Sequence, residues 1–225
     1  MKIEELGIRP VWAEIDLNNL SHNIREVRRV TSSESLIMAA VKADAYGHGA
    51  VMCAKIFLEN GADRLATATL GEAVQLRKEG IEAPILCLGY VPSYLFPKVL
   101  ENDIGVTIYS LKKAKDLSEA ATDADEAARI HIKVDTGMGR LGFQVSESTL
   151  EEIQEIASLS GLSIEGIFTH FAVADEPRES YTRRQFALFM EMVDGLEKNG
   201  IEFPLKHVSN SAAIIDYPEY SLDMV

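Results

Sequence analysis

Lys42 is the residue of this chain whose position most clearly predicts chemistry. It follows the apolar run Leu36–Val41, which is typical of a buried strand, and it precedes a turn bracketed by Gly47 and Gly49. A lysine at the carboxyl end of such a strand lies at the mouth of an α/β fold, where substrates bind. A partly desolvated amine favours its neutral form, which can attack an aldehyde and form an imine. The sequence therefore predicts a nucleophilic lysine at this position.

A second group of polar side chains lies in the predicted strand at residues 129–135. His131, Lys133 and Asp135 share one face of that strand, and in a barrel this polar face points inward. Charges that point into a barrel must be paired, because an isolated buried charge is too costly. Lys133 and Asp135, with Arg140 in the glycine-rich turn that follows, predict an ion network. That network is either purely structural or also borders the active site.

Two further candidates come after predicted strands. His170 ends the strand predicted at 163–170, and it is either a satisfied core histidine or, like Lys42, a site residue at the carboxyl end of a strand. Ser211 follows the strand predicted at 205–209 and precedes a short helical segment, Ala212 to Asp216. It is either an ordinary N-cap of that segment or part of a phosphate site, since amide groups at a helix start and a hydroxyl both bind anions.

The two histidines of the N-terminal quarter carry weaker signals. His22 lies in the helix-like stretch 20–24 and is expected at the surface. His48 follows Gly47 and is expected either to line the pocket or to cap a helix.

Short apolar runs alternate with longer amphipathic ones along the chain, as expected for strands that alternate with helices. Strands are predicted at 11–17, 36–42, 64–68, 84–89, 105–109, 129–135, 163–170, 205–209 and 222–225, and helices at 49–59, 70–79, 111–121, 148–159 and 183–198. Strand and helix in repeated alternation predict a parallel sheet with helices outside. Seven or eight such units favour an α/β fold of the (β/α)8 TIM-barrel type over an open sheet. Neither GxGxxG nor a Walker loop occurs to support the open-sheet alternative.

Both ends of the chain depart from the repeat. The strand predicted at 11–17 alternates strongly and precedes the barrel units, so it is expected to belong to another sheet. Residues 221–225 look like the start of an eighth strand. The eighth unit is therefore expected to be incomplete, and the chain to be a piece of a longer protein, because a barrel needs its eighth strand to close.

Composition narrows the class of protein. The 225 residues are 47% hydrophobic and 25% charged, which is ordinary for a globular domain. A net charge of −13 and a pI near 4.8 argue against nucleic acid or an anionic membrane as the main partner. Cys53 and Cys87 form neither a disulfide framework nor a zinc motif, so no metal is expected. Without a signal-like run or a long apolar segment, the protein is expected to be cytoplasmic.

With these residues in view, the chain resembles the N-terminal, pyridoxal-phosphate-binding barrel domain of alanine racemases. The resemblance covers nearly the whole chain, and the block 41–49 is similar to that family's lysine signature, which is highly specific. The matching blocks, in the family's order, are RPVWAEIDL at 9–17, VKADAYGHG at 41–49, KVDTGMGRLG at 133–142, THFA at 169–172 and SNSA at 209–212.

The resemblance implies roles for the residues around pyridoxal 5′-phosphate. Lys42 would form the internal aldimine and, once released by the substrate, act as the base on one face of Cα. Tyr46 and Ser211 would bind the phosphate, Asn210 would border the phosphate site, and His170 would lie against the pyridine ring.

The same resemblance implies a modification of the inward lysine. In this family Lys133 is commonly carbamylated by carbon dioxide, which turns a cation into an anion beside Arg140. The supporting network of Lys133, Asp135 and Arg140 would then contain charges of opposite sign.

The implied activity is interconversion of L- and D-alanine by two-base proton transfer, which supplies D-alanine for peptidoglycan precursors. The second base would be a tyrosine from the C-terminal β domain of a partner subunit, so the intact protein is expected to be a homodimer. Residues 1–225 would form the barrel domain, residues 1–17 would pair with the β domain, and the chain by itself is expected to be inactive. A serine or broad-specificity racemase stays open. So does a single-domain pyridoxal-phosphate-binding barrel without turnover. A decarboxylase of the same barrel type fits less well, since its lysine context differs.

Overall fold

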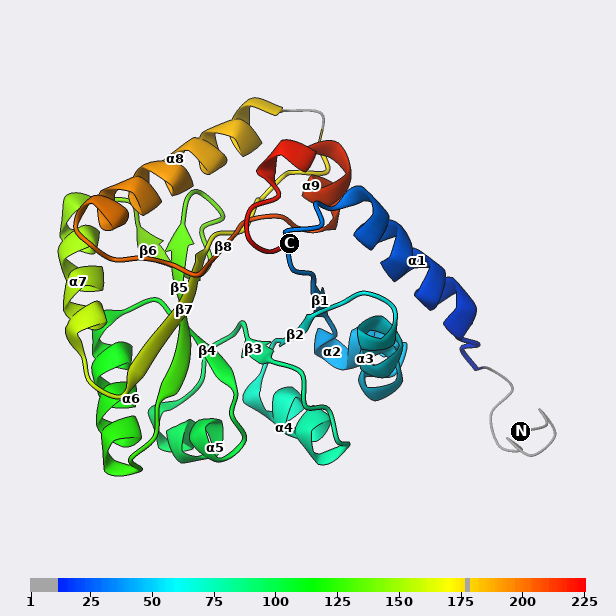
Figure 1. Ribbon diagram of the computed structural model, residues 1–225, viewed down its shortest axis with the longest axis horizontal. Coiled ribbons are helices and arrows are strands. Elements are labelled where there is room, and N and C mark those ends of the chain that lie inside the picture. Colours follow the sequence, from blue (N-terminus) through cyan, green and yellow to red (C-terminus); the bar gives the residue numbers. More distant parts are fainter. Residues whose placement is uncertain (1–11, 177–178) are drawn as a thin grey trace.

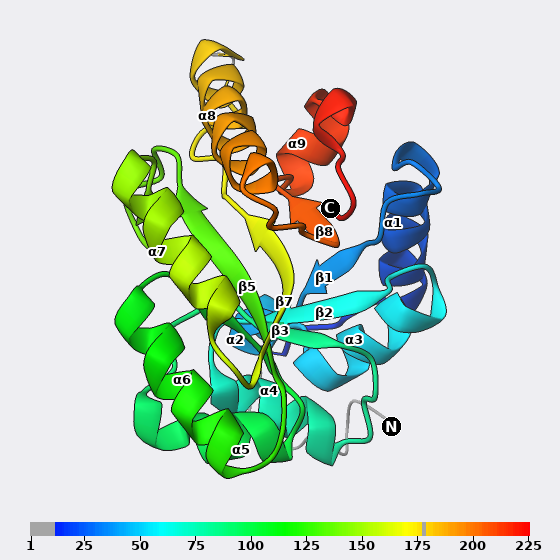
Figure 2. The same ribbon diagram turned by 60° about the vertical axis from the view of Figure 1, so that its left-hand side comes forward.

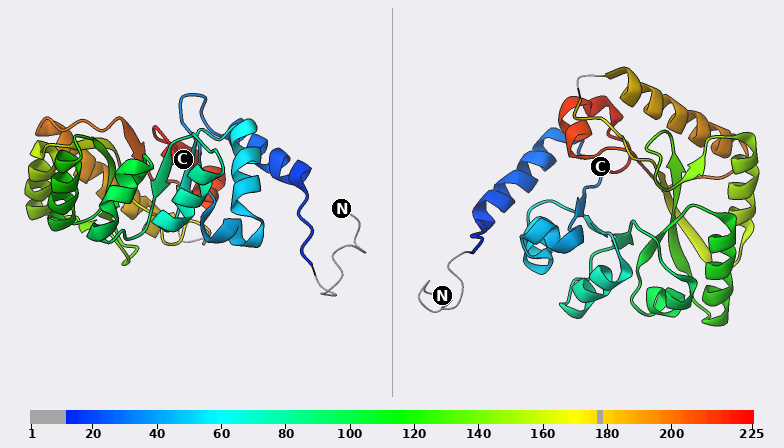
Figure 3. Two further views of the ribbon diagram at one scale, coloured as in Figure 1. Left: turned by 90° about the horizontal axis from the view of Figure 1, so that it is seen from below. Right: turned by 180° about the vertical axis from the view of Figure 1, so that it is seen from behind.

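The computed structural model describes residues 12–176 and 179–225. Its parallel strands form one sheet in the order β1-β2-β3-β4-β5-β7-β8, with helices around the outside (Figure 1). The view from behind in Figure 3 shows the same outer layer of helices. The predicted α/β architecture of the TIM-barrel type is confirmed, and the barrel is incomplete at its eighth unit.

The strands lie within two residues of the ranges predicted for them. Their ends are set by where the ladder hydrogen bonds stop, which pattern alone locates only approximately. The short strand β6 was not predicted, and it pairs with β5 beside the main path of the sheet. The strands are β1 (Met38–Ala40), β2 (Arg64–Thr67), β3 (Ile85–Cys87), β4 (Gly105–Ile108), β5 (Ala128–Asp135), β6 (Phe143–Gln144), β7 (Leu162–Phe168) and β8 (Leu205–His207).

The helices predicted from amphipathic runs are also present. Hydroxyl side chains begin three of them: Thr69, Ser110 and Ser146 each accept a hydrogen bond from an amide of the first turn. The helices are α1 (Leu17–Val30), α2 (Lys42–Gly47), α3 (Ala50–Glu59), α4 (Leu70–Lys78), α5 (Phe96–Glu101), α6 (Leu111–Asp123), α7 (Glu147–Ser158), α8 (Glu179–Lys198) and α9 (Ser211–Asp216), with 3₁₀ turns η2 (Ser93–Leu95) and η3 (Pro218–Tyr220).

The segment predicted as a leading strand is different in the structure. Residue 11 lies outside the described part of the chain, residues 12–16 join no strand, and Leu17 begins α1. Asp16 caps this helix, since its Oδ1 accepts from the amides of Asn18 and Asn19 at 2.8 and 3.3 Å. α1 lies beside α3 (Figure 2). Pairing of residues 1–17 with a further domain stays a prediction.

Residues 223–225 lie between the two edges of the sheet, as the predicted eighth strand requires. Met224 forms parallel bridges to both Leu36 and His207. The amide of Met38 donates to the Val225 carbonyl at 2.8 Å, which places the C-terminus beside β1 (Figure 1). The contacts are those of an eighth strand, but they extend over a single bridged residue on each side.

A continuous apolar core fills the space between sheet and helices. It includes the two cysteines, both buried free thiols as expected, and burial raises the pKa of Cys87 to about 11. Within residues 12–176 and 179–225, no helix combines the length and apolarity needed to cross a membrane.

Candidate active site

The predicted site residues come together around one cavity of about 710 Å³, which extends from the interior of the sheet to the carboxyl ends of its strands. Its size suits a cofactor or small substrate. Asp135 is the one predicted site residue that does not line it. The predicted residues that do are Lys42, Tyr46, Lys133, Arg140, His170, Asn210 and Ser211.

Lys42 begins a turn of unusual handedness. The four residues after it, from Ala43 to Tyr46, have φ between 50° and 55° and ψ between 39° and 46°, which is a left-handed helical conformation. For residues with a Cβ this conformation costs roughly 1–2 kcal/mol each, so it persists only where the surroundings hold it. The sequence predicted a turn here but not its handedness.

The far end of this turn is fixed to α3. Asp44 accepts twice: its carbonyl takes the amide of Gly49 at 3.0 Å, and its Oδ1 takes the amide of Ala50 at 2.7 Å. The amide of Ala45 donates to the Val41 carbonyl at 3.0 Å, which returns the turn to the end of β1. The left-handed turn is therefore tied to the elements on both sides of it.

Tyr46 and His48 leave this turn in different directions. The Tyr46 side chain is 73% exposed and lies at the rim of the cavity. His48 does not line the cavity; its Nδ1 lies 2.9 Å from the Ala45 carbonyl, and it ends α2. Of the two readings offered for His48, the capping one is correct. His22 is exposed on α1, as predicted.

Lys133 is a buried lysine, and among the residues that the structure describes no carboxylate forms an ion pair with it. Its side chain is 5% exposed, its Nζ donates to the Val134 carbonyl at 2.9 Å, and Nζ lies 5.1 Å from the centre of the Phe168 ring. Burial lowers the pKa of Lys133 to about 8, Asp135 opposes this shift, and Arg140 adds to it. A substantial neutral fraction of this amine is therefore present near neutral pH.

Asp135 was predicted to belong to an ion network, but in the structure its carboxylate accepts hydrogen bonds from backbone amides. Oδ1 accepts from the amides of Gly137 and Gly139 at 2.9 and 3.1 Å, and Oδ2 accepts from the amide of Arg140 at 3.1 Å. Burial raises the pKa of Asp135, but these backbone donors and Lys133 outweigh it and lower the pKa overall. Asp135 thus shapes the turn that carries the exposed Arg140 to the cavity.

His170 is half-buried and follows β7, and a side chain of α8 forms hydrogen bonds with the backbone around it. Gln185, fully buried on α8, donates to the His170 carbonyl at 3.1 Å and accepts from the Ala172 amide at 2.9 Å. Burial, with the nearby cations Arg140, Lys133 and Lys42, lowers the pKa of His170 to about 4. The imidazole facing the cavity is therefore neutral at physiological pH.

Of the two alternatives for Ser211, the N-cap role is wrong by one residue. Asn210 caps α9, with its Oδ1 accepting from the Ala213 amide at 3.0 Å, and Ser211 is the first helical residue. The side-chain oxygen of Asn210 reaches the third amide of the helix, which is the usual N-cap geometry. Its use as a cap leaves the hydroxyl of Ser211 exposed at the cavity.

The buried histidines His131 and His207 and the half-buried Glu165 form a hydrogen-bonded series that the sequence did not predict. Nε2 of His131 faces Glu165 Oε2 at 3.4 Å, and its Nδ1 faces Nε2 of His207 at 3.0 Å. The hydrogen bond from His131, with Arg64 and Arg129, lowers the pKa of Glu165 to about 2. Since this carboxylate is ionised, His131 donates to it and accepts from His207. A charged residue inside the predicted strand 163–170 was the available signal.

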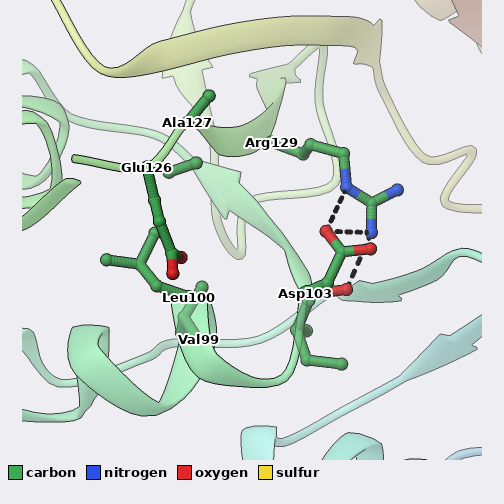
Figure 4. Close-up of a pocket in the computed structure, with 8 residues that line it drawn as sticks. Val99, Leu100, Asp103, Glu126, Ala127 and Arg129 are labelled. Carbon is green, nitrogen blue, oxygen red and sulfur yellow. Dashed lines mark hydrogen bonds and ion pairs between the residues drawn. The ribbon is translucent and has the colours of Figure 1, made fainter. Parts of the chain in front are cut away.

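A second hollow, of about 350 Å³, lies at the amino ends of β4 and β5. Figure 4 shows the Arg129 guanidinium turned toward Asp103, and the two form an ion pair at 2.8 Å. The charges of Arg129 and Asp103 thus pair with each other. Among the described residues, no group of three or more His, Cys, Asp or Glu side chains is arranged to hold a metal ion.

Comparison with known proteins gives matches to a single family. A family model described as "Alanine racemase, N-terminal domain" matches residues 15–225. Curated relatives include the alanine racemase of Methanococcus maripaludis, 52% identical over 96% of this chain and 58% of the relative, and that of Clostridium tetani, 48% identical over 97% and 56%.

Solved structures agree with these relatives. An alanine racemase of Clostridium difficile superimposes with a TM-score of 0.95 at 43% identity, covering 97% of this chain and 57% of that one. The alanine racemase of Bacillus anthracis with bound L-Ala-P gives 0.88 at 37% identity, covering 97% and 56%. The chain thus spans a little over half the length of the proteins it matches.

Proposed function

Because this chain belongs to the alanine racemase N-terminal domain family, we propose that it is the cofactor-binding barrel of a racemase that interconverts L- and D-alanine. The observation that carries this proposal is the placement of Lys42 at the mouth of a cavity that Tyr46, His170 and Ser211 also line. For the whole protein of which this chain is a part, we propose racemase activity, alanine as the substrate, a homodimeric state and a cytoplasmic location.

The cavity fits pyridoxal 5′-phosphate in size and chemistry. Its volume of about 710 Å³ lies in the range of cofactor sites. Lys42 offers an amine for covalent attachment, and the hydroxyls of Tyr46 and Ser211 are donors suited to a phosphate. Asn210 borders this end of the cavity. The neutral imidazole of His170 can lie against an aromatic ring without adding a charge.

The division of labour follows from these groups. Pyridoxal phosphate, when bound, supplies the electron sink that makes the α proton of an amino acid acidic. Lys42 would hold the cofactor and move a proton at one face of the substrate Cα. A proton on the opposite face needs a second group, and its identification as a tyrosine of a partner subunit stays a prediction from the resemblance.

Lys133 is proposed to be carbamylated. The reaction needs a neutral amine: Nζ attacks carbon dioxide, loses a proton and becomes a carbamate anion. With a pKa of about 8, roughly a tenth of this amine is neutral at pH 7, far more than for an exposed lysine. An anion at this buried position beside Arg140 would replace two like charges by an opposite-charge pair. Mass spectrometry of the intact chain under carbon dioxide tests this, since a K133M variant must lose the added mass.

Absorption spectroscopy tests the cofactor role. The wild-type chain mixed with pyridoxal phosphate is expected to develop a visible band that Lys42→Ala abolishes. Lys55→Ala is the matched control, because Lys55 is an exposed lysine on α3 away from the cavity, and this variant must keep the band. A band that survives in Lys42→Ala, or none in the wild type, contradicts the proposal.

A single-domain carrier of pyridoxal phosphate is the alternative, and activity separates the two. If the racemase assignment is correct, the 225 residues alone show negligible alanine racemisation, and the protein with the remaining length of its relatives is active. An inactive protein of full length that still binds the cofactor favours the carrier.

A further inference from the structure

Glu72 on α4 reaches across to the turn that carries Lys42. Its Oε1 accepts from the amide of Ala43 at 2.8 Å, while its Oε2 accepts from the amides of Ala68 and Thr69 at 2.8 and 3.1 Å. One carboxylate thus joins the end of β1 to the junction of β2 and α4. Glu72 is half-buried, and it does not line the cavity.

The Oε2 contacts are those of an ordinary helix start. Thr69 and Glu72 form a capping box, in which each side chain accepts from the other residue's amide, and this satisfies amides at the beginning of α4. The contact to Ala43 is additional, because Ala43 belongs to a different element, 29 positions earlier in the chain. A capping role alone does not account for it.

The amide that Glu72 accepts from belongs to the peptide unit between Lys42 and Ala43. That unit is planar, so fixing the direction of its N–H also fixes the carbonyl side of Lys42. Ala43 is also the first residue of the left-handed turn, whose conformation is unfavourable for residues with a Cβ. Asp44 fixes the far end of this turn, and Glu72 fixes its start.

We propose that Glu72 is a positioning residue for Lys42: its Oε1 holds the Lys42–Ala43 peptide and thereby the direction in which the lysine enters the cavity. This inference rests on the proposed function for its consequence, since an oriented amine matters only if Lys42 carries a cofactor. Its geometric content, the anchoring of the left-handed turn, is independent of any cofactor.

The test compares three variants of the 225-residue chain. Glu72→Ala removes all three hydrogen bonds of the carboxylate. Glu72→Gln keeps the size of the side chain, but its NH₂ group must face an amide donor, so one side of the bridge is lost. Thr69→Ala is the matched control, because it removes the Thr69 Oγ1 acceptor of the capping box and leaves the Glu72–Ala43 contact in place.

Two readouts separate positioning from capping. Hydrogen exchange of the amides at residues 43–46 is expected to speed up at least tenfold in Glu72→Ala and less than threefold in Thr69→Ala. The dissociation constant for pyridoxal phosphate, followed by the visible band, is expected to rise at least tenfold in Glu72→Ala and to change less than threefold in Thr69→Ala. Glu72→Gln, which keeps one acceptor oxygen, should lie between the wild type and Glu72→Ala in both.

The outcomes are distinct. If Thr69→Ala changes exchange and affinity as much as Glu72→Ala, Glu72 acts through the start of α4 and the proposal is wrong. It is also wrong if exchange at residues 43–46 is unchanged in both Glu72 variants. If the wild type never forms the visible band, the proposed function fails, and the exchange data still decide the anchoring role.

Discussion

Ala43→Gly is expected to stabilise the protein, although the same replacement destabilises an ordinary helix. Ala43 is exposed, with φ 52° and ψ 46°. Relief of the left-handed conformation gains about 1–2 kcal/mol, and the extra freedom of glycine in the unfolded chain costs about 0.5–1 kcal/mol. The net change worked from these values is a stabilisation of up to about 1.5 kcal/mol, with a midpoint of about 0.75 kcal/mol. The amide to Glu72 is retained, because glycine keeps its N–H.

The control is Ala187→Gly, at an exposed position in the right-handed helix α8. There the substitution relieves no strain and is expected to cost about 1 kcal/mol. Urea unfolding followed by circular dichroism compares the free energy of unfolding of both variants with that of the wild type. In a thermal unfolding experiment, a change of 1 kcal/mol corresponds to about 2–4 °C in Tm for a protein of this size. Loss of equal stability in both variants would mean that the turn after Lys42 is not left-handed in solution.

Three further predictions follow from burial and close packing. The free energy of unfolding should rise between about pH 8 and pH 10.5, because Lys133 has a lowered pKa in the folded protein and therefore holds a proton in this range only when the chain is unfolded. Urea titrations at several pH values should show that Lys133→Met removes this rise. The free energy of unfolding should fall as the pH drops from about 6.5 toward 4, because burial lowers the pKa of His170 to about 4 and the imidazole takes up a proton on unfolding. In the same assay, His170→Asn should show a shallower dependence on pH. Gly166→Ala should lower the free energy of unfolding by about 3 kcal/mol, because its Cβ would lie 2.5 Å from the Leu205 carbonyl oxygen, whereas Gly71→Ala in α4 meets no atom closer than 3.9 Å and should raise it by about 0.5–1 kcal/mol. Thermal unfolding of the two variants checks this, and equal effects would contradict the packing argument.

Much of the site could be predicted because its residues share a local context. Lys42 and His170 each follow an apolar run, and in a parallel sheet such positions gather at one end. The period of the apolar residues similarly located the strands and most of the helices. These inferences need only neighbours in sequence, which is why the strands from β1 to β8, apart from β6, were located to within two residues, whereas α8 begins four residues before the predicted position.

Long-range contacts decided what local pattern could not. The left-handed turn after Lys42 is made of residues that favour other conformations, and it depends on Glu72, far along the chain, for one of its anchors. The N-cap of α9 was also ambiguous from local pattern, because either Asn210 or Ser211 could serve. In the structure, Asn210 is the N-cap. The contact of His131 with His207 likewise depends on the sheet, which brings side chains of β5 and β8 together across the intervening β7.

The amino-acid sequence by itself determined the order of strands and helices, the polar residues at the strand ends and the family resemblance, since periodicity and residue type act over a few positions. Only the tertiary structure decided the handedness of the lysine turn, the use of Asp135 for backbone amides and the neutral state of His170. Each of these depends on burial and on partners that folding brings together from distant parts of the chain.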